Sequence, residues 1–144
     1  MFYGRFEHTI DEKGRLTIPA KFREALIPGL TVTRGLDQCL YVFPKDDWDR
    51  FAAKLKQLPL TNTSARSLTR FFLSYADDSK PDKQGRVLIP NYLREFAKLG
   101  DRVIVGGQGD RLEVWNIEAW ETQRAKLEQD PEGLAAQLTD LGIL

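Results

Sequence analysis

The stretch HTIDEKGRLTIPAKFRE, residues 8–24, occurs a second time in altered form as SKPDKQGRVLIPNYLRE, residues 79–95. Both contain Asp, then three residues ending in Gly, then Arg, at Asp11–Arg15 and Asp82–Arg86. Both continue through a short apolar run into Ile-Pro and reach Arg-Glu four residues later. A phrase repeated about half a chain length apart predicts two copies of one structural unit.

The repetition extends well beyond the quoted stretch. At a shift of 71 residues Val32 falls on Val103, and past one inserted residue the shift becomes 72, so that Trp48 falls on Trp120. The tripeptide AKL at residues 53–55 then matches AKL at 125–127. Two copies of a unit of roughly 50 residues are too few for a solenoid and favour a pseudo-two-fold object.

Each unit has the same local plan. EHTI predicts a short strand, DEKG a tight hairpin turn with Gly at its last position, and RLTI the return strand. Pro19 suits the first turn of a helix through AKFREAL, and two further strands and a helix over about residues 45–58 follow. The second unit repeats this plan through DKQG, RVLI, PNYLREFAKL, RVIVGG, LEVW and a helix over about 117–129.

Two segments lie outside the repeat. A stripe of apolar side chains at helical spacing, from Leu68 to Tyr75, predicts a helix that bridges the units. After Pro131 a short amphipathic tail helix is expected, and its apolar side could dock on the body or on a neighbouring subunit. The predicted organisation is a first repeat at 1–58, a linker and bridging helix at 59–76, a second repeat at 77–129 and a tail helix at 130–144. A half-chain of roughly 70 residues could fold alone only marginally, because it buries little surface, so one shared core is expected.

The net charge is zero, with 21 basic and 21 acidic residues. Residues 1–111 nevertheless hold 19 basic against 14 acidic side chains, and residues 112–144 hold 2 against 7. This is either chance segregation or a cationic working face with an acidic end kept away from it. The single cysteine, Cys39, excludes an internal disulfide, and no stretch is typical of a signal peptide or a membrane span. We therefore expect a soluble, cytoplasmic protein.

Little in the sequence indicates an enzyme. The only histidine, His8, is replaced by Ser79 in the second copy, and no cluster has the spacing of metal ligands. GGQGD at 106–110 lacks the Lys and the helix of a phosphate-binding loop. We expect no catalysis, no cofactor and no metal; a barrel enzyme that uses the carboxylates of Asp11 and Asp82 is a third hypothesis.

The repeated Arg has two interpretations. An Asp and an Arg around a tight turn can form a surface pair that staples the hairpin. Alternatively, a pseudo-two-fold brings both turns together, and two guanidinium groups with neighbouring lysines suit phosphate oxygens or a guanine edge, with the Asp orienting the Arg. The candidate DNA-binding residues are Arg15, Arg86, Lys13 and Lys83, and those that position the turns are Asp11, Gly14, Asp82 and Gly85.

The start MFYGRFEHTIDEKGRLTIPAKFRE, the repeat DKQGRVLIPNYLRE and the LEVW segment resemble the MraZ family, bacterial transcriptional regulators with two domains of the AbrB type. The resemblance implies an α+β fold, a double-split or swapped-hairpin β-barrel of two ββαββα repeats with flanking helices. It also implies double-stranded promoter DNA as the partner, repression of the division and cell-wall gene cluster and of the protein's own gene, and a closed homo-oligomeric ring at the nucleoid. The family's DNA-contacting arginines correspond to Arg15 and Arg86, whereas Gln84 replaces Lys13 in the second copy.

A protein-interaction module such as an antitoxin is the competing interpretation, since AbrB-type folds also serve there. No disordered, inhibitor-like tail follows the domain, which argues against it.

Overall fold

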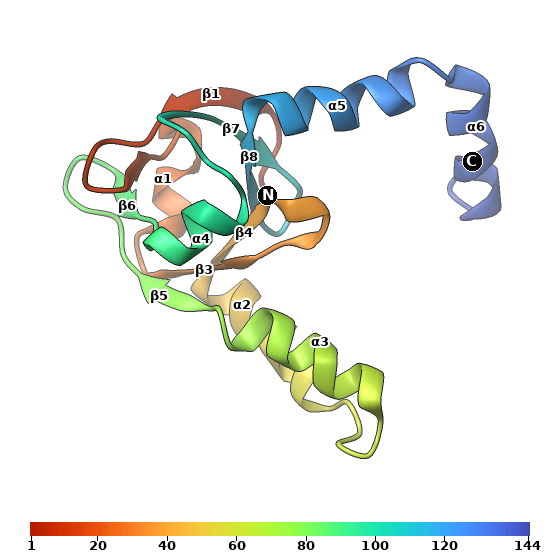
Figure 1. Ribbon diagram of the computed structural model, residues 1–144, viewed down its shortest axis with the longest axis horizontal. Helices are drawn as coiled ribbons and strands as arrows, with labels where there is room; N and C mark the ends of the chain where they lie inside the picture. The colour runs from red at the N-terminus through yellow and green to blue at the C-terminus, as the bar shows by residue number, and fades with distance from the viewer.

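The computed structural model describes residues 1–144 and shows a β-rich body from which two helical arms extend (Figure 1). No helix combines the length and apolar character needed to cross a membrane. The elements, in chain order, are β1 (Arg5–Thr9), β2 (Arg15–Thr17), α1 (Ala20–Leu26), β3 (Leu30–Arg34), a 3-10 turn (Leu36–Gln38), β4 (Leu40–Pro44), α2 (Lys45–Lys56), α3 (Thr63–Leu73), β5 (Asp77–Ser79), β6 (Arg86–Leu88), α4 (Asn91–Phe96), β7 (Arg102–Gly107), β8 (Leu112–Asn116), α5 (Ile117–Glu128) and α6 (Pro131–Asp140).

Six strands form one antiparallel sheet in the order β1-β7-β8-β4-β3-β5. This order interleaves the two units, because β1 of the first unit pairs with β7 of the second, and β5 of the second pairs with β3 of the first. The sheet is open, so the α+β architecture matches the AbrB-like double-split barrel without full closure.

The remaining strands, β2 and β6, pair only with each other, in register Arg15↔Leu88, Leu16↔Val87 and Thr17↔Arg86. We call this pair the β2–β6 ribbon. The sequence predicted that the strand after each turn returns along the strand before it, and this is wrong apart from the single bridge Ile10↔Leu16. Instead, the return strands are exchanged between units, which is the swapped arrangement that the family resemblance implied.

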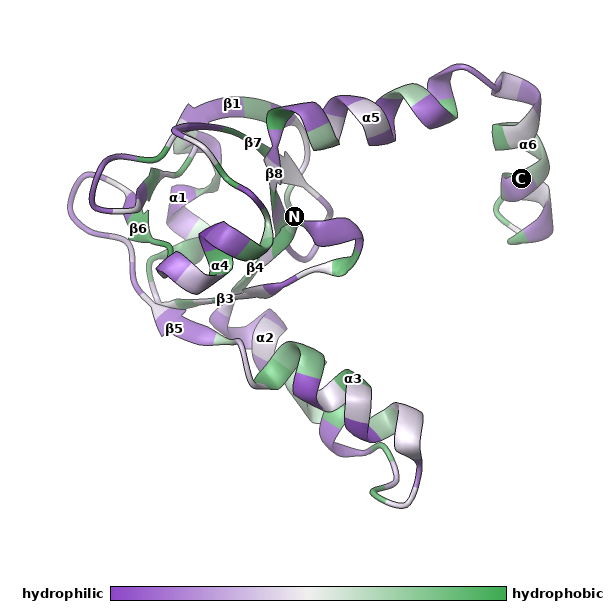
Figure 2. Ribbon diagram, in the orientation of Figure 1, coloured by the Kyte–Doolittle hydropathy of each residue, from purple (hydrophilic) through white to green (hydrophobic).

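The two units contribute to one apolar core. Leu16 and Val87, on the inner side of the β2–β6 ribbon, are fully buried. They belong to a cluster of 18 buried residues drawn from both units, together with the first residues after the strands, Ile18 and Ile89. The ribbon therefore packs its inner side against the core that it shares with the six-stranded sheet. Figure 2 shows hydrophobic residues along the strands of the body and mostly hydrophilic residues along α5.

Three helices, α2, α3 and α5, cover the other face with a largely aromatic cluster. The bridging helix α3 begins at Thr63, earlier than the apolar stripe predicts, because the Asn62 side chain accepts the backbone N–H of Ala65 and caps the first turn. Arg34 lies against this helix, with its guanidinium 3.6 Å from the centre of the Tyr75 ring and its Nε–H donated to the carbonyl oxygen of Phe71 at 3.0 Å.

Candidate nucleic-acid interface

The two Asp-x-x-Gly-Arg segments form two nearly identical turns at the end of the body opposite the helical arms (Figure 1). In the first, the Gly14 N–H donates to the Asp11 carbonyl oxygen at 2.9 Å, and the Asp11 N–H donates to the Arg15 carbonyl oxygen at 3.0 Å. In the second, the Gly85 N–H donates to the backbone oxygen of Asp82 at 3.0 Å. Both glycines have positive φ, +85° and +74°, which is why the last turn position is Gly in each copy.

Each Asp side chain organises its turn and fixes its Arg. Oδ1 of Asp11 accepts the backbone N–H of Lys13 at 3.0 Å and of Arg15 at 2.9 Å, and Oδ2 accepts the Arg15 Nε–H at 2.8 Å. Asp82 does the same for Gln84 and Arg86, at 2.9, 2.8 and 2.9 Å. The structure thus repeats one hydrogen-bond pattern in both copies.

This geometry leaves the outer edge of each guanidinium available. The Asp uses the Nε–H, and the four N–H groups of the two terminal nitrogens remain, since an Arg carries five donors in all. Arg15 has no second partner, and Arg86 Nη1 lies 3.7 Å from Asp11 Oδ2, across the ribbon. That contact also shows that the two turns are neighbours, as the pseudo-two-fold predicted.

The aspartates are ionised acceptors. The backbone N–H of Arg15 is the largest cause that lowers the pKa of Asp11, against a smaller opposing effect of burial and with further help from the Arg15 side chain. The backbone N–H of Arg86 lowers the pKa of Asp82 in the same way. A carboxylic acid that donates a proton near neutral pH requires a raised pKa, so the arrangement opposes the acid–base hypothesis for this pair.

The turns are supported crosswise by two arginines to which the sequence assigned no role. Arg23, on α1 of the first unit, lies under the second turn, where a Cβ added to Gly85 would be 2.4 Å from its Nε. Arg94, on α4 of the second unit, lies under the first turn, where a Cβ on Gly14 would be 2.9 Å from its Cζ. The available signal was that both recur at matched positions of the repeat, as Arg15 does.

Each of these helix arginines also joins the turn to the ribbon. Arg23 Nε donates to the Ile18 carbonyl oxygen at 2.9 Å, while the Ile18 N–H donates to the Gly85 carbonyl oxygen at 3.0 Å. Arg94 Nε donates to the Ile89 carbonyl oxygen at 3.0 Å, and the Ile89 N–H reaches the first turn at 2.8 Å. A guanidinium of one unit therefore lies under the turn of the other and is linked to it through one residue, Ile18 or Ile89.

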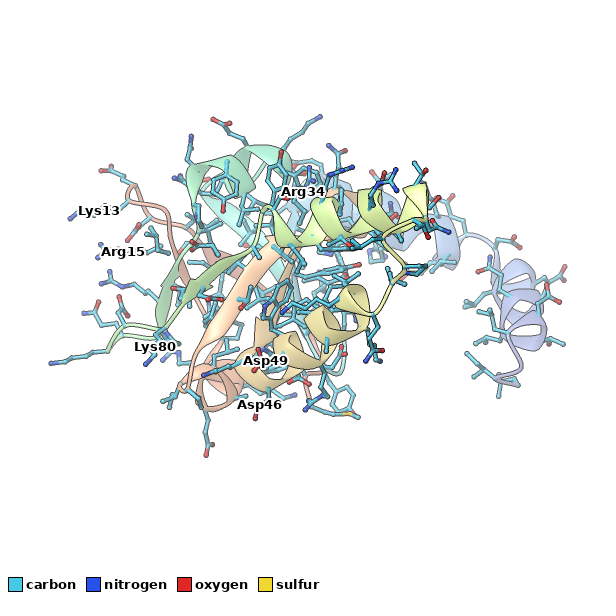
Figure 3. The ribbon with its side chains drawn as sticks, turned by 90° about the horizontal axis from the view of Figure 1, so that it is seen from below. Lys13, Arg15, Arg34, Asp46, Asp49 and Lys80 are labelled. Atoms are coloured by element: carbon cyan, nitrogen blue, oxygen red, sulfur yellow. The ribbon has the colours of Figure 1, made fainter.

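The outer face of the ribbon lies between the two arginines. Because Leu16 and Val87 face the core, their neighbours Arg15, Thr17 and Leu88 face outward. Leu88 is 51% exposed and lies at the end of β6, directly opposite Arg15. Lys13 lies at the exposed end with Arg15, and Lys80 lies at the same end (Figure 3).

The cations outnumber the acids at this end of the molecule. The two turn segments, residues 11–15 and 80–86, hold five basic side chains (Lys13, Arg15, Lys80, Lys83 and Arg86) and three acidic ones (Asp11, Glu12 and Asp82). Arg23 and Arg94 lie beneath the turns, and Asp101 lines a hollow with Asp11 and Glu12. The neutral net charge of the chain therefore conceals an excess of basic side chains around the turns.

Outside the two turns, the structure offers no metal-binding cluster and no activated cysteine. No group of three or more His, Cys, Asp or Glu could hold a metal ion. Cys39 is fully buried, and burial raises the pKa of its thiol well above the ordinary value, so it is not poised as a nucleophile.

Comparison with known proteins identifies the family of this chain. The family described as "MraZ protein, putative antitoxin-like" matches residues 1–71 and again residues 72–140. A protein of Desulforamulus reducens is 48% identical over 98% of this chain and 99% of its own length. Proteins of Thermoanaerobacter sp. and Natranaerobius thermophilus are 49% and 42% identical over 99% of this chain and their whole lengths. All three bear the name Transcriptional regulator MraZ, which confirms the prediction that the chain is not an enzyme. The chain belongs to the MraZ family.

Proposed function

We propose that this protein is a transcription regulator that binds double-stranded promoter DNA in a sequence-specific manner through its two Asp-x-x-Gly-Arg turns. The observation that carries the proposal is the matched pair of arginines, Arg15 and Arg86. Each is held by its own Asp through Nε, and each leaves its terminal N–H groups uncommitted or only loosely engaged at one cationic end.

The chemistry of that end suits a DNA groove. Two terminal N–H groups of one guanidinium match the O6 and N7 acceptors of guanine, or two phosphate oxygens. A two-stranded ribbon fits the width of the major groove. Lys13 and Lys83, exposed on the turns, would contact phosphates and set the register, and Asp11 and Asp82 would orient the arginines.

The exposed Leu88 adds an apolar side chain to the same face. A side chain of this kind between two arginines suits the methyl group of thymine, which also lies in the major groove. Thr17 occupies the equivalent position in the first copy, so the two halves of the ribbon would read different bases.

One neutral subunit with two turns is expected to bind DNA weakly, and a ring of subunits would raise the overall affinity through effective concentration. Cyclic symmetry presents copies of the same face side by side, so the ring would bind direct repeats near one helical turn apart, about 10 bp. We infer that these boxes lie upstream of the protein's own gene and of the division and cell-wall gene cluster, which it represses at the nucleoid in the cytoplasm.

The test is binding to a duplex from upstream of the protein's own gene, measured by fluorescence anisotropy. Arg15→Ala and Arg86→Ala should each raise Kd about 5- to 150-fold, because one bidentate contact corresponds to roughly 1–3 kcal/mol. Arg50→Ala, at an exposed arginine of α2, is the matched control and should bind within twofold of the wild type. The wild-type Kd should also rise steeply with salt. Normal binding by folded Arg15→Ala would refute the assignment of the turns.

A second candidate rests on the family description, which contains the words antitoxin-like. In that case the cationic end would bind a toxin protein. Co-purification of the protein with the product of a neighbouring gene, abolished by Arg15→Ala and unaffected by competing duplex, would favour it over DNA binding.

A further inference from the structure

The two turns differ in charge although their hydrogen bonds match. Residues 9–17 hold two basic and two acidic side chains, whereas the equivalent residues 80–88 hold three basic side chains and one acidic. The charge differs at three matched positions: Lys80 replaces Thr9, Lys83 replaces Glu12, and Gln84 replaces Lys13. The first turn is therefore neutral, and the second has an excess of two positive charges.

The arginines beneath the turns are available to a ligand. Arg23 and Arg94 are half-buried, and each donates its Nε–H to a carbonyl oxygen of its own unit. Their terminal nitrogens form no hydrogen bond or ion pair within the chain, and the turn carboxylates pair with Arg15 and Arg86 instead. A guanidinium group with free terminal N–H groups is suited to a phosphate.

The surroundings of these two arginines are unequal. The hollow that Arg94 borders, of about 230 Å³, is also lined by three carboxylates, whose charges oppose the approach of a phosphate. They belong to Asp11, Glu12 and Asp101. The matched positions in the other half are Asp82, Lys83 and Leu30. Since only one of these is acidic, Arg23 is the more favourable of the two arginines for an anion.

The effect of Arg23 on a neighbour agrees with this difference. Burial, and after it the positive charge of Arg23, lowers the pKa of the His8 imidazole. The charge of this guanidinium therefore acts on its surroundings and is not cancelled by a carboxylate of its own.

Lys80 extends the positive region on the outside of the second turn. It is exposed, and Figure 3 shows it at the same end of the molecule as Lys13 and Arg15. It borders a hollow with Asp49 and Asp78 but forms no ion pair with either. Its ammonium group is therefore free to bind a phosphate, which a lysine does as a point charge on a flexible stem.

We propose that Lys80 and Arg23 bind phosphates of the DNA backbone beside the second turn, and that their counterparts Thr9 and Arg94 do not. This inference rests on the proposed function, in which both turns lie in the groove. It adds two phosphate contacts, both of them at the second turn.

Unequal ends give the β2–β6 ribbon a direction on the duplex. A pseudo-two-fold ribbon with equal ends would bind a box either way round. Here Arg15 and the exposed Leu88 lie opposite each other at the first-turn end and suit the reading of bases, while the second-turn end anchors the backbone. Copies bound to direct repeats would therefore all lie the same way round.

The salt dependence of DNA binding tests the proposal, measured by fluorescence anisotropy on the duplex from upstream of the protein's own gene. Each lost phosphate contact should lower the slope of log Kd against log salt concentration by about 0.9 for every bound subunit. We expect this fall in Lys80→Thr, which introduces the residue of the first copy. Lys54→Thr, at an exposed lysine of α2, is the control and should keep the wild-type slope. A wild-type slope in Lys80→Thr, or an equal fall in the control, would overturn the role of Lys80.

Arg23→Gln and Arg94→Gln form a matched pair of variants. Both remove a guanidinium group from beneath a turn, so their structural effects should be alike. The slope should fall by about 0.9 for every bound subunit in Arg23→Gln and keep its wild-type value in Arg94→Gln. Equal slopes in the two variants would overturn the proposal, because both arginines would then act in the same way.

Phosphate ethylation interference on the same duplex tests the direction. The phosphates at which ethylation blocks binding should lie mainly on one side of each box, and Lys80→Thr should lose part of them. A pattern that is equal on both sides would show that the ribbon has no direction.

These outcomes separate from those of the proposed function. If Arg15→Ala abolishes binding while Lys80→Thr and Arg23→Gln keep the wild-type slope, the added contacts are wrong and the DNA-binding proposal stands. If folded Arg15→Ala binds DNA normally, the assignment of the turns is wrong, whatever the slopes.

Discussion

Replacing Arg23 with Ala removes a side chain of the first unit, and we expect the main effect in the turn of the second unit. The Arg23 Nε donates to the Ile18 carbonyl oxygen at 2.9 Å, and its guanidinium lies under Gly85. A hydrogen bond from a charged group contributes about 1.5–3 kcal/mol, and partial exposure of Arg23 reduces this to about 1–2 kcal/mol. Such a loss corresponds to roughly 5- to 30-fold in the population of the opened turn.

Native-state hydrogen exchange measures this loss residue by residue. In Arg23→Ala the amides of residues 84–86, all hydrogen-bonded to Asp82, should exchange about 5- to 30-fold faster. The amides of residues 13–15 in the first turn should change little. Arg94→Ala is the matched variant, and it should reverse the pattern.

Two results would refute this reasoning. If Arg23→Ala accelerated exchange at residues 13–15 and left 84–86 protected, each helix would support its own turn. If neither turn responded in a variant that keeps its secondary structure, the guanidinium would carry no support at all, and the close approach to Gly85 would be only a packing contact.

Three further perturbations test other parts of the structure. Gly85→Ala should lower the free energy of unfolding by about 2–3 kcal/mol and Gly14→Ala by about 1–2 kcal/mol, because both positions have positive φ and the Cβ added at residue 85 lies closer to a guanidinium nitrogen. Urea unfolding measures both values, and equal effects would contradict this reasoning. Arg34→Leu should cost about 2–3 kcal/mol through the lost bond to the Phe71 oxygen and the lost aromatic contacts, and a change below about 0.5 kcal/mol in thermal unfolding would refute it. Above about pH 5, Asp11→Asn should lower the free energy of unfolding by an amount that does not change with pH. The difference between wild type and variant should vanish below about pH 4, as the pH falls through the lowered pKa of the native carboxyl, and a difference that persists at pH 2 would contradict the lowered pKa.

The local features were predictable because they depend on local chemistry. The turns follow from Gly at a position of positive φ and from an Asp that can accept the N–H groups two and four residues later. The pairing of β2 with β6 was not predictable from the residues, because a tight turn between two apolar runs is equally compatible with a simple hairpin. That choice depends on which strand lies opposite in the folded chain.

The arginines divide in the same way. Arg15 and Arg86 could be recognised from the sequence because both copies of the repeat place them beside the turns. Arg23 and Arg94 are repeated equally well, but they lie on helices, where a charged residue normally indicates only a solvated face. Arg34 has no counterpart, since Val105 occupies the equivalent place in the second unit. Its partners on α3 and α4 become visible only once the chain is folded.

The exchange between units explains why the whole phrase is repeated and not only its turn. In the repeated segment, the glycine of each turn and the helix arginine of the other unit pack together: Gly85 leaves room for Arg23, and Gly14 leaves room for Arg94. Each arginine also bonds a carbonyl oxygen of its own unit, so it connects that unit to the turn of the other. A larger side chain at either glycine would displace a guanidinium of the opposite unit, and loss of either arginine would loosen the opposite turn. Each turn, with its outward arginine, therefore depends on a helix of the other unit. We expect a change in one unit to alter the geometry of the turn in the other.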